Sequence, residues 1–178
     1  MFRTPHVVNY QIINTPIGYA LIAASDKGLC YLIFGDSCQQ LENNLKGNFP
    51  DNFFSKNLAL MGKYTQLIDR YLPGQRNDFH FTFDIKATAF QWAVWQRLLE
   101  IPIGKTLSYQ NIAQSLGNYR STRAVARACS SNPIGLIIPC HRVIRSDGKI
   151  GGYKWGVQRK LALLKLEQAM TTKKLTLL

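Results

Sequence analysis

The segment Ile134-Gly135-Leu136-Ile137-Ile138-Pro139-Cys140-His141-Arg142-Val143 places a reactive pair of side chains directly after a short apolar run. Its first five residues predict a buried strand, because apolar runs of this length are typical of one. The proline has no backbone N–H, so a strand inside a sheet should end before it. Cys140 then lies beside an imidazole and a guanidinium, and such positive surroundings favour the thiolate. The alternative is a cysteine buried as a small apolar side chain.

Length and composition indicate a protein with a packed core. The chain has 178 residues, of which 46% are hydrophobic and 11% aromatic, enough for one large domain or two small ones. No apolar run reaches about 18 residues, so no membrane span is predicted. The N-terminus lacks the features of a signal peptide, and the cysteines lack CxxC spacing, so we expect reduced thiols, no metal site and a cytoplasmic location. The cysteines are Cys30, Cys38, Cys129 and Cys140.

The net charge of +12 is distributed very unevenly along the chain. Residues 1–85 contain seven Lys/Arg and seven Asp/Glu, whereas residues 86–178 contain fifteen Lys/Arg and three Asp/Glu. The second half therefore carries the whole positive surplus. A basic half joined to a neutral half predicts that only one of them contacts a polyanion, and nucleic acid is the expected partner.

The first half, residues 1–85, is predicted to be an α/β scaffold domain. Turn signals between alternating, β-branched segments predict an antiparallel sheet. Helical spacing predicts a short helix ending near Gly47 and another from about Lys56 to Tyr71, with Leu60 on its apolar face. The predicted strands are Val7–Ile13, Tyr19–Ala24, Leu29–Phe34 and Phe79–Phe83. No residue of this half belongs to a catalytic or zinc-binding pattern.

The second half begins with the start signal of a helix. Thr88 can cap the amide of Gln91 while the Gln91 side chain reaches back, which is a capping box. Pro102 should end this helix. Its predicted apolar stripe consists of Phe90, Val94, Leu98 and Ile101.

Two short helices joined by a tight turn follow, Tyr109–Leu116 capped by Ser108 and Thr122–Ser130 capped by Ser121. In a basic region they predict a mostly α domain, residues 86–170, with a winged-helix-like helix-turn-helix. Arg123 and Arg127 are one helical turn apart in the second helix. Its other residues include no Asn or Gln to recognise adenine, so we expect binding through phosphates and shape.

A glycine-rich segment and a closing helix complete the second half. Residues 150–156, Ile-Gly-Gly-Tyr-Lys-Trp-Gly, can line a pocket for a flat ring, because glycines allow close backbone approach. The closing helix is predicted from Val157 to about Met170, followed by a frayed tail, residues 171–178. Its predicted apolar face consists of Val157, Leu161 and Leu164, and its one acid, Glu167, would ordinarily be solvated.

Taken together, these motifs resemble the O6-alkylguanine-DNA alkyltransferases. The resemblance covers roughly Thr88 to Glu167, and the first half resembles the variable N-terminal domain of that family only in length and strand-helix order. The matching segments are Ile138–Ile144, Thr88–Gln91, Ile101–Gly104, Ser108–Tyr109, Arg123–Val125, Asn132–Pro133 and Gly152–Tyr153. Proteins of this family repair DNA by moving an alkyl group from guanine O6 to one of their own cysteines, once and without regeneration.

The resemblance implies catalytic roles for five residues. Cys140 resembles the nucleophile, His141 the general base that acts through a bound water, and Glu167 the acid that orients the imidazole. Tyr109 resembles the tyrosine that rotates the nucleotide and donates to guanine. Asn132 resembles the residue that braces the turn before the active-site segment. No cofactor and no metal are implied.

The resemblance also implies DNA contacts in the minor groove and a pocket for the lesion. Arg123 resembles the residue that fills the gap left by the flipped base. The expected DNA-binding residues are Arg123, Ala124, Arg127, Arg120 and Ser146, and the expected pocket residues are Val143, Gly152, Tyr153 and Lys154. The expected partner is double-stranded DNA containing O6-alkylguanine, bound by a monomer, and O4-alkylthymine is left open as a substrate.

Three other functions fit parts of the sequence. A lesion-binding homologue without transfer activity would replace the nucleophile, but Cys140 is present. A transcription factor of the adaptive-response type shares the Trp155-Gly156 context, but its cysteine-rich regulatory module is not found, so a stand-alone repair protein is expected. A cysteine hydrolase is disfavoured by the adjacent Cys-His pair and by the basic DNA-binding half.

Overall fold

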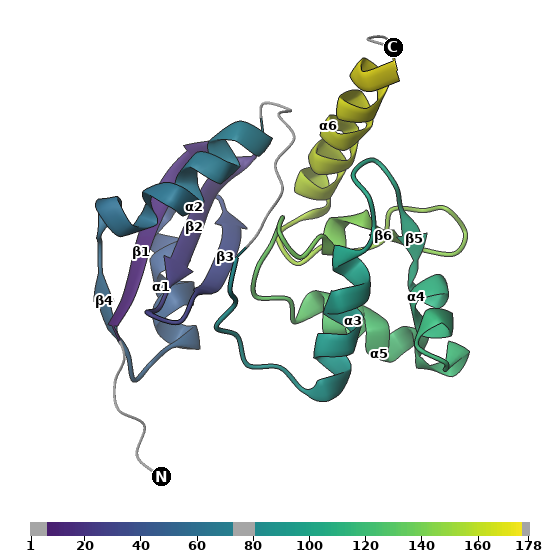
Figure 1. The fold of residues 1–178 in the computed structure, drawn as a ribbon, viewed down its shortest axis with the longest axis horizontal. Coiled ribbons are helices and arrows are strands. Elements are labelled where there is room, and N and C mark those ends of the chain that lie inside the picture. The colour runs from purple at the N-terminus through teal and green to yellow at the C-terminus, as the bar shows by residue number, and fades with distance from the viewer. Residues whose placement is uncertain (1–6, 73–80, 176–178) are drawn as a thin grey trace. The chain divides into compact units, whose positions relative to one another are not determined.

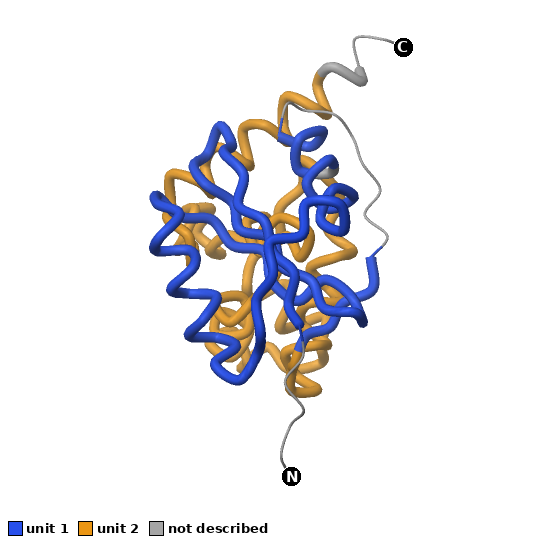
Figure 2. The backbone as a smooth tube through the Cα atoms, turned by 90° about the vertical axis from the view of Figure 1, so that its left-hand side faces the viewer, with its two compact units in different colours: residues 1–85 blue, residues 86–178 orange. Residues whose placement is uncertain are grey.

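The computed structural model describes residues 7–72 and 81–175, and the chain divides into two compact units, residues 1–85 and 86–178. The two units are coloured separately in Figure 2. The predicted class is confirmed: a sheet with helices forms the first unit, and a mostly helical domain forms the second. No helix in the described part of the chain is both long and apolar enough to cross a membrane.

Unit 1 is a four-stranded sheet with one helix on each face (Figure 1). The strands are β1 (Val7–Thr15), β2 (Gly18–Ala24), β3 (Leu29–Gly35) and β4 (Phe53–Ser55), in the order β3-β2-β1-β4. The first three form the predicted antiparallel meander, whereas β4 pairs parallel with β1 and was not predicted. Three residues carry too little periodicity to identify such a strand.

Two helices cover the sheet of unit 1. Helix α1 (Cys38–Asn48) begins at a Ser37 cap and packs on β2 and β3, and α2 (Leu58–Tyr71) begins at an Asn57 cap and packs on β1 and β2. Met61 and Ile68 of α2 are buried, but Leu60 is 55% exposed. The prediction that Leu60 belongs to the apolar face is therefore wrong, because the buried face follows Met61 one residue later.

The predicted strand at residues 79–83 is only partly visible, because Phe79 and His80 lie outside the described residues. The remainder forms a single parallel bridge, Leu29 to Phe83, rather than a returning strand. The Leu29 N–H donates to Thr82 O at 2.9 Å, and the Asp84 N–H donates to Leu29 O at 2.9 Å. This contact brings the backbone of Thr82 against Gly28, where φ is +149°.

Unit 2 begins with α3 (Ala89–Leu99), and the capping box of Thr88 and Gln91 is confirmed. Helix α3 buries Val94, Leu98 and Trp95, and the indole N–H of Trp95 donates to Ala128 O at 2.8 Å. Phe90 is 38% exposed, so the buried stripe begins one turn later than predicted.

The helix-turn-helix consists of α4 (Tyr109–Ser115), a 3-10 turn η1 (Tyr119–Ser121) and α5 (Thr122–Ser130). Strands β5 (Leu107–Ser108) and β6 (Val143–Ile144) pair in parallel beside it. Ser108 caps α4 as predicted, but Ser121 does not cap α5. The Ser121 hydroxyl donates to Asn118 O instead, because the 3-10 turn brings that carbonyl within reach.

The predicted strand at Ile134–Ile138 is wrong, although all five residues are buried. The segment is a turn in which the Ile138 N–H donates to Ile134 O at 3.1 Å, and Leu136 has φ of +68°. An apolar run of five residues predicts burial but does not distinguish a strand from a packed turn. The turn leads into η2 (Cys140–Arg142), a 3-10 segment.

Helix α6 (Val157–Leu175) closes unit 2. Residues 171–175 are helical, so the prediction of a frayed tail from Thr171 is wrong for them; the hydroxyls of Thr171 and Thr172 donate to Gln168 O within the helix. The predicted apolar face is also wrong. The fully buried positions are Lys160, Leu163 and Glu167, whereas Val157 is 42% exposed.

Replacing Gly28 by Ala should destabilise unit 1, because the new Cβ would lie 2.3 Å from Thr82 O on a backbone with positive φ. We expect the free energy of unfolding to fall by about 1–3 kcal/mol. Gly47→Ala is the matched control: it lies in α1 with nothing within 4 Å of the new Cβ, and it should stabilise by about 0.5–1 kcal/mol. Urea denaturation of both variants checks this; equal effects would contradict the close approach.

Candidate active site

Cys140 lies at the start of η2 and is 4% exposed. Its backbone N–H donates to Ile138 O at 2.8 Å, which closes the turn that leads into η2. The Asn132 side chain donates through Nδ2 to the Cys140 Sγ at 3.2 Å. The sulfur is therefore held in a defined position within the protein interior.

Asn132 joins the end of α5 to this turn and is fully buried. Its Nδ2 also donates to Ile138 O at 2.8 Å, and its Oδ1 accepts from the Ile134 N–H at 2.9 Å. Both ends of the amide are thus used, so the side chain replaces the hydrogen bonds that a strand would have given to residues 134–138. The resemblance implied that the Asn132 amide braces the turn before the active-site segment, and its hydrogen bonds lie in that turn.

His141 and Arg142, the two residues after Cys140 in η2, form a buried ionic cluster with Glu167 of α6. The His141 Nε2 lies 2.6 Å from Glu167 Oε1, and the Arg142 Nε donates to Glu167 Oε2 at 2.9 Å. The Arg142 guanidinium also donates to Ile101 O, and the Gly104 N–H donates to Glu167 Oε2 at 3.2 Å. Glu167 is fully buried, unlike an ordinary lone glutamate on a helix, because it meets these donors.

The cluster sets the charges of its members. Burial alone raises the pKa of Glu167, but the hydrogen bonds and charges of His141 and Arg142 outweigh burial and hold its pKa at about 2. Burial lowers the pKa of His141, and Glu167 offsets this only in part. The imidazole is consequently neutral at pH 7, and its buried Nδ1 has no hydrogen-bond partner among the described residues.

The thiol of Cys140 is protonated in the resting protein. Burial raises its pKa to about 11, and the Asn132 hydrogen bond and the charge of Lys160 oppose this only in part. The prediction that its sequence neighbours favour the thiolate is therefore wrong for this state. His141 is neutral, and the charge of Arg142 is compensated by Glu167, so neither neighbour supplies the expected positive field.

Tyr109 is the first residue of α4 and is half-buried. Burial raises its pKa to about 12, and the nearby thiols of Cys129 and Cys140 add to the effect. A Cβ atom at Gly151 would lie 3.7 Å from the Tyr109 hydroxyl. The glycine-rich loop, residues 150–156, therefore closely approaches the phenol, and both lie near the thiol.

The pocket residues predicted from sequence lie in or beside that loop. Val143 is fully buried, Gly152 is exposed, and Tyr153 packs edge-on against Trp155 with ring centroids 5.1 Å apart. The Lys154 Nζ donates to Asn132 O at 3.3 Å and lies 5.5 Å from the centre of the Trp155 ring. Lys154 and Cys140 thus contact the same residue, Asn132.

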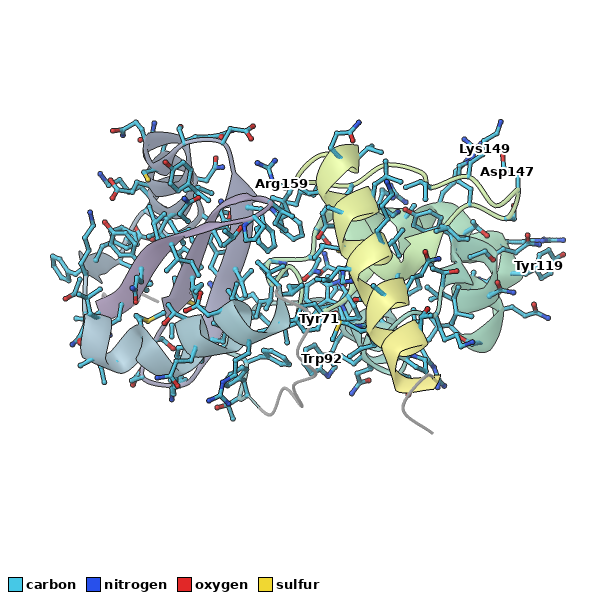
Figure 3. All side chains as sticks on the ribbon, turned by 90° about the horizontal axis from the view of Figure 1, so that it is seen from above. Tyr71, Trp92, Tyr119, Asp147, Lys149 and Arg159 are labelled. Carbon is cyan, nitrogen blue, oxygen red and sulfur yellow. The ribbon has the colours of Figure 1, made fainter. Side chains whose placement is uncertain are left out.

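The predicted DNA-binding residues lie on the surface of unit 2. Arg123 and Arg127 of α5 are exposed, Ala124 is half-buried, and Ser146 is exposed beyond β6. Arg120 in η1 donates through Nε to the Tyr119 hydroxyl at 3.1 Å. In Figure 3, Tyr119 projects outward at the end of unit 2 away from α6. None of these residues shares a hydrogen bond with the thiol among those described.

Sequence reasoning missed Lys160. It is fully buried in α6 and donates through Nζ to Val143 O at 2.5 Å and to Gly152 O at 3.2 Å. Its position seven residues before Glu167, on the same helix face, was the available signal.

In the described part of the chain, no three His, Cys, Asp or Glu side chains are grouped so as to hold a metal ion.

Comparison with known proteins shows the family of the chain. The model of the 6-O-methylguanine DNA methyltransferase DNA-binding domain matches residues 89–169, and the model of the ribonuclease-like domain of the same proteins matches residues 8–85. The methylated-DNA–protein-cysteine methyltransferase of Methanosarcina barkeri is 40% identical over 159 residues, which are 89% of this chain and 96% of that protein. The chain belongs to the 6-O-methylguanine DNA methyltransferase family, as its motifs predicted.

Solved structures and a longer relative agree with this assignment. The structure of the Mycobacterium tuberculosis O6-methylguanine methyltransferase is 35% identical with a TM-score of 0.74, covering 92% of this chain and 94% of that one. Another structure of the M. tuberculosis protein, in complex with DNA, has a TM-score of 0.75 at 33% identity, covering 91% and 94%. The bifunctional transcriptional activator/DNA repair enzyme Ada of Escherichia coli is 38% identical over 90% of this chain, but the chain spans only 45% of its length.

Glu167→Gln should destabilise the protein by about 3–5 kcal/mol, because it leaves the buried Arg142 guanidinium without a compensating charge. Glu100→Gln is the matched control, since Glu100 forms an exposed i,i+3 pair with Arg97 and should change stability by less than about 1 kcal/mol. Urea denaturation near neutral pH measures both. Similar losses in the two variants would contradict the role of the cluster.

The ionised carboxylate of Glu167 should also make the folded protein less stable at low pH. The pKa of Glu167 is about 2 in the folded protein against an ordinary value of 4.5, so its stabilisation is complete above pH 4.5 and is lost as pH falls toward 2. We expect the wild-type protein to lose stability across this interval and Glu167→Gln to lose less. Parallel pH profiles for the two proteins would contradict this assignment.

Proposed function

We propose that the protein repairs DNA directly, by transferring an alkyl group from O6 of guanine to the Cys140 Sγ in a single turnover. The observation that carries this proposal is a thiol held by Asn132 and followed directly in the chain by His141, which pairs with the buried Glu167. Support also comes from the exposed arginines of the helix-turn-helix in the same unit and from the similar proteins named for this activity.

The chemistry requires a sulfur nucleophile and a path for its proton. The thiol proton passes, through a bound water, to Nδ1 of His141, which is neutral and has no hydrogen-bond partner among the described residues. The sulfur attacks the alkyl carbon, the bond from that carbon to O6 breaks, and the electron pair stays on guanine. Guanine then takes up a proton, for which Tyr109 is the donor.

Glu167 and Arg142 support this proton transfer. The carboxylate holds His141 Nε2 at 2.6 Å, which orients the ring and stabilises the imidazolium as it forms. Because His141 and Arg142 together keep the pKa of Glu167 low, the carboxylate stays ionised while the imidazole gains its proton. The raised pKa of Cys140 keeps the resting thiol protonated until a substrate approaches.

Access to guanine O6 requires that the nucleotide leaves the base stack. We propose that α5 enters the minor groove, where the small Ala124 lets the backbone approach and Arg123 fills the gap left by the flipped base. Arg120, Arg127 and Ser146 contact phosphates, which gives affinity without sequence preference. Support for this comes from their exposed positions and from the DNA complex of the M. tuberculosis relative.

The glycine-rich loop is proposed to hold the flipped base. Gly152 and Tyr153 line the ring, Val143 forms the floor, and Lys154 borders the alkyl group through its contact with Asn132 O. O4-alkylthymine is proposed as a second substrate, because it also carries an alkyl group on an exocyclic ring oxygen. We further propose that the protein acts as a monomer in the cytoplasm, with double-stranded DNA as its partner.

Exposure to DNA containing O6-methylguanine should add one methyl group per protein molecule and then exhaust the protein. Intact-protein and peptide mass spectrometry should place the methyl on Cys140 and leave exposed Cys38 unmodified. Cys140→Ala should remove the transfer completely. Repeated turnover, or a methyl group on another residue, would overturn the proposal, and binding without any adduct would favour a lesion-binding protein.

Arg123→Ala should impair base flipping, whereas Cys140→Ala should leave DNA affinity largely unchanged. Fluorescence of 2-aminopurine placed beside the lesion reports flipping, and titration of labelled duplex reports affinity. Arg97→Ala is the control, because Arg97 is an exposed arginine of α3 paired with Glu100 outside the helix-turn-helix. Equal losses of DNA binding in the Arg123 and Cys140 variants would contradict this division of roles.

A further inference from the structure

Lys160 carries a charge in a position where lysine is almost never found. Its side chain is fully buried in α6, and no ion pair in the described part of the chain joins it to a carboxylate. Buried lysines are rare unless they are paired, because removing an ammonium from water is expensive. The protein therefore keeps a destabilising cation at this point of the core.

The partners of Lys160 are two backbone carbonyls from the two segments that flank the thiol. Its Nζ donates to Val143 O at 2.5 Å and to Gly152 O at 3.2 Å. Val143 follows η2, and its N–H donates to Cys140 O, while Gly152 belongs to the glycine-rich loop. A single ammonium thus joins the turn that carries Cys140 to the loop proposed to hold the base.

Glu167, the acid on the same face of α6 as Lys160, already pairs with other side chains. Glu167, the one acid in the sequence of α6, is bound by Arg142 and His141. The charge of Lys160 consequently has no anionic partner in the described structure while Cys140 is protonated. A negative charge that appears nearby during the reaction would supply one.

Four titratable groups on the surrounding elements interact electrostatically with Cys140: Tyr109 of α4, Cys129 of α5, Lys154 of the glycine-rich loop and Lys160 of α6. Of these, only the two lysines can carry a positive charge, and burial lowers the pKa of both. Lys160 is fully buried, whereas Lys154 is an exposed residue. Because water screens a buried charge less, Lys160 acts on the sulfur more strongly.

We propose that Lys160 is a positioning residue for alkyl transfer: its ammonium fixes the thiol turn against the glycine-rich loop and stabilises the thiolate of Cys140 when it forms. The interaction is mutual, because Lys160 lowers the pKa of Cys140 while the thiols of Cys140 and Cys129 counteract the effect of burial on the pKa of Lys160. The importance of this residue for repair rests on the proposed function, but its effect on the thiol does not.

Lys160→Gln separates the charge from the hydrogen bonds, since the amide can still donate to a carbonyl. An opposite charge at close range lowers a pKa by one to three units, so its removal should raise the pKa of Cys140 by at least about one unit. The thiolate fraction then falls about tenfold. A more basic thiolate is also more nucleophilic, and this gain offsets up to half of the tenfold loss on a logarithmic scale. The alkylation of Cys140 should therefore be at least about threefold slower in Lys160→Gln than in the wild-type protein.

The rate of Cys140 alkylation by iodoacetamide, followed by peptide mass spectrometry from about pH 7 to about pH 10, measures this effect. Exposed Cys38 in the same molecule is the internal reference, and Lys165→Gln, at an exposed position of the same helix, is the matched control. We expect slower reaction of Cys140 only in Lys160→Gln. An unchanged rate in a folded Lys160→Gln protein would overturn the proposal.

A second variant, Lys160→Met, covers the case in which Lys160→Gln does not fold, because a buried ion is often replaced by an apolar side chain of similar size without loss of stability. It also removes the positive charge, so Cys140 should react more slowly with iodoacetamide than in the wild-type protein. An unchanged rate in folded Lys160→Met would overturn the proposal. Both experiments omit DNA, so they test the effect of Lys160 on the thiol separately from DNA repair. If the proposed alkyl transfer fails, the mass of Cys140 stays unchanged after exposure to alkylated DNA; if this inference fails, the iodoacetamide rate stays unchanged.

Discussion

The buried carboxylate of Glu167 is the interaction on which unit 2 depends. It lies on the inner face of α6 and accepts from the guanidinium of Arg142, the imidazole of His141 and the N–H of Gly104. A charge removed from water is stable only if it is paired and hydrogen-bonded, and these donors come from segments more than twenty residues away in sequence. The carboxylate therefore fixes the helix, the thiol turn and the loop after α3 relative to one another within the unit.

The same constraint explains why the thiol turn is not a strand. Residues 134–138 are buried, so their backbone groups need partners, and Asn132 supplies two of them while it also holds the Cys140 sulfur. Lys160 supplies a further donor to Val143 O on the other side of η2. The turn is thus held by polar side chains inside the core, which is a costly arrangement to retain unless the position of the sulfur matters.

The charges that act on the Cys140 sulfur are not those of its neighbours in the sequence. His141 and Arg142 follow Cys140 directly, yet His141 is neutral and the charge of Arg142 is compensated by Glu167, and the pKa of Cys140 stays at about 11. The cations that do act on the sulfur, Lys154 and Lys160, are separated from it by 14 and 20 positions in the sequence. A neighbour along the chain affects a thiol only if its charge remains uncompensated in the fold.

The sequence by itself determined the sheet-then-helix order, the capping box at Thr88, the helix-turn-helix, the basic second half and the nucleophile candidate, because periodicity, caps and charge are local properties. Only the tertiary structure decided that Glu167 and Lys160 are buried, that Leu60 faces solvent, that the run from Ile134 is a turn and that α6 continues to Leu175. These features depend on which elements face one another, and the pairing of distant polar groups leaves no periodic signal in the chain. Burial and compensation of charge, rather than residue type, therefore determine the properties of the site.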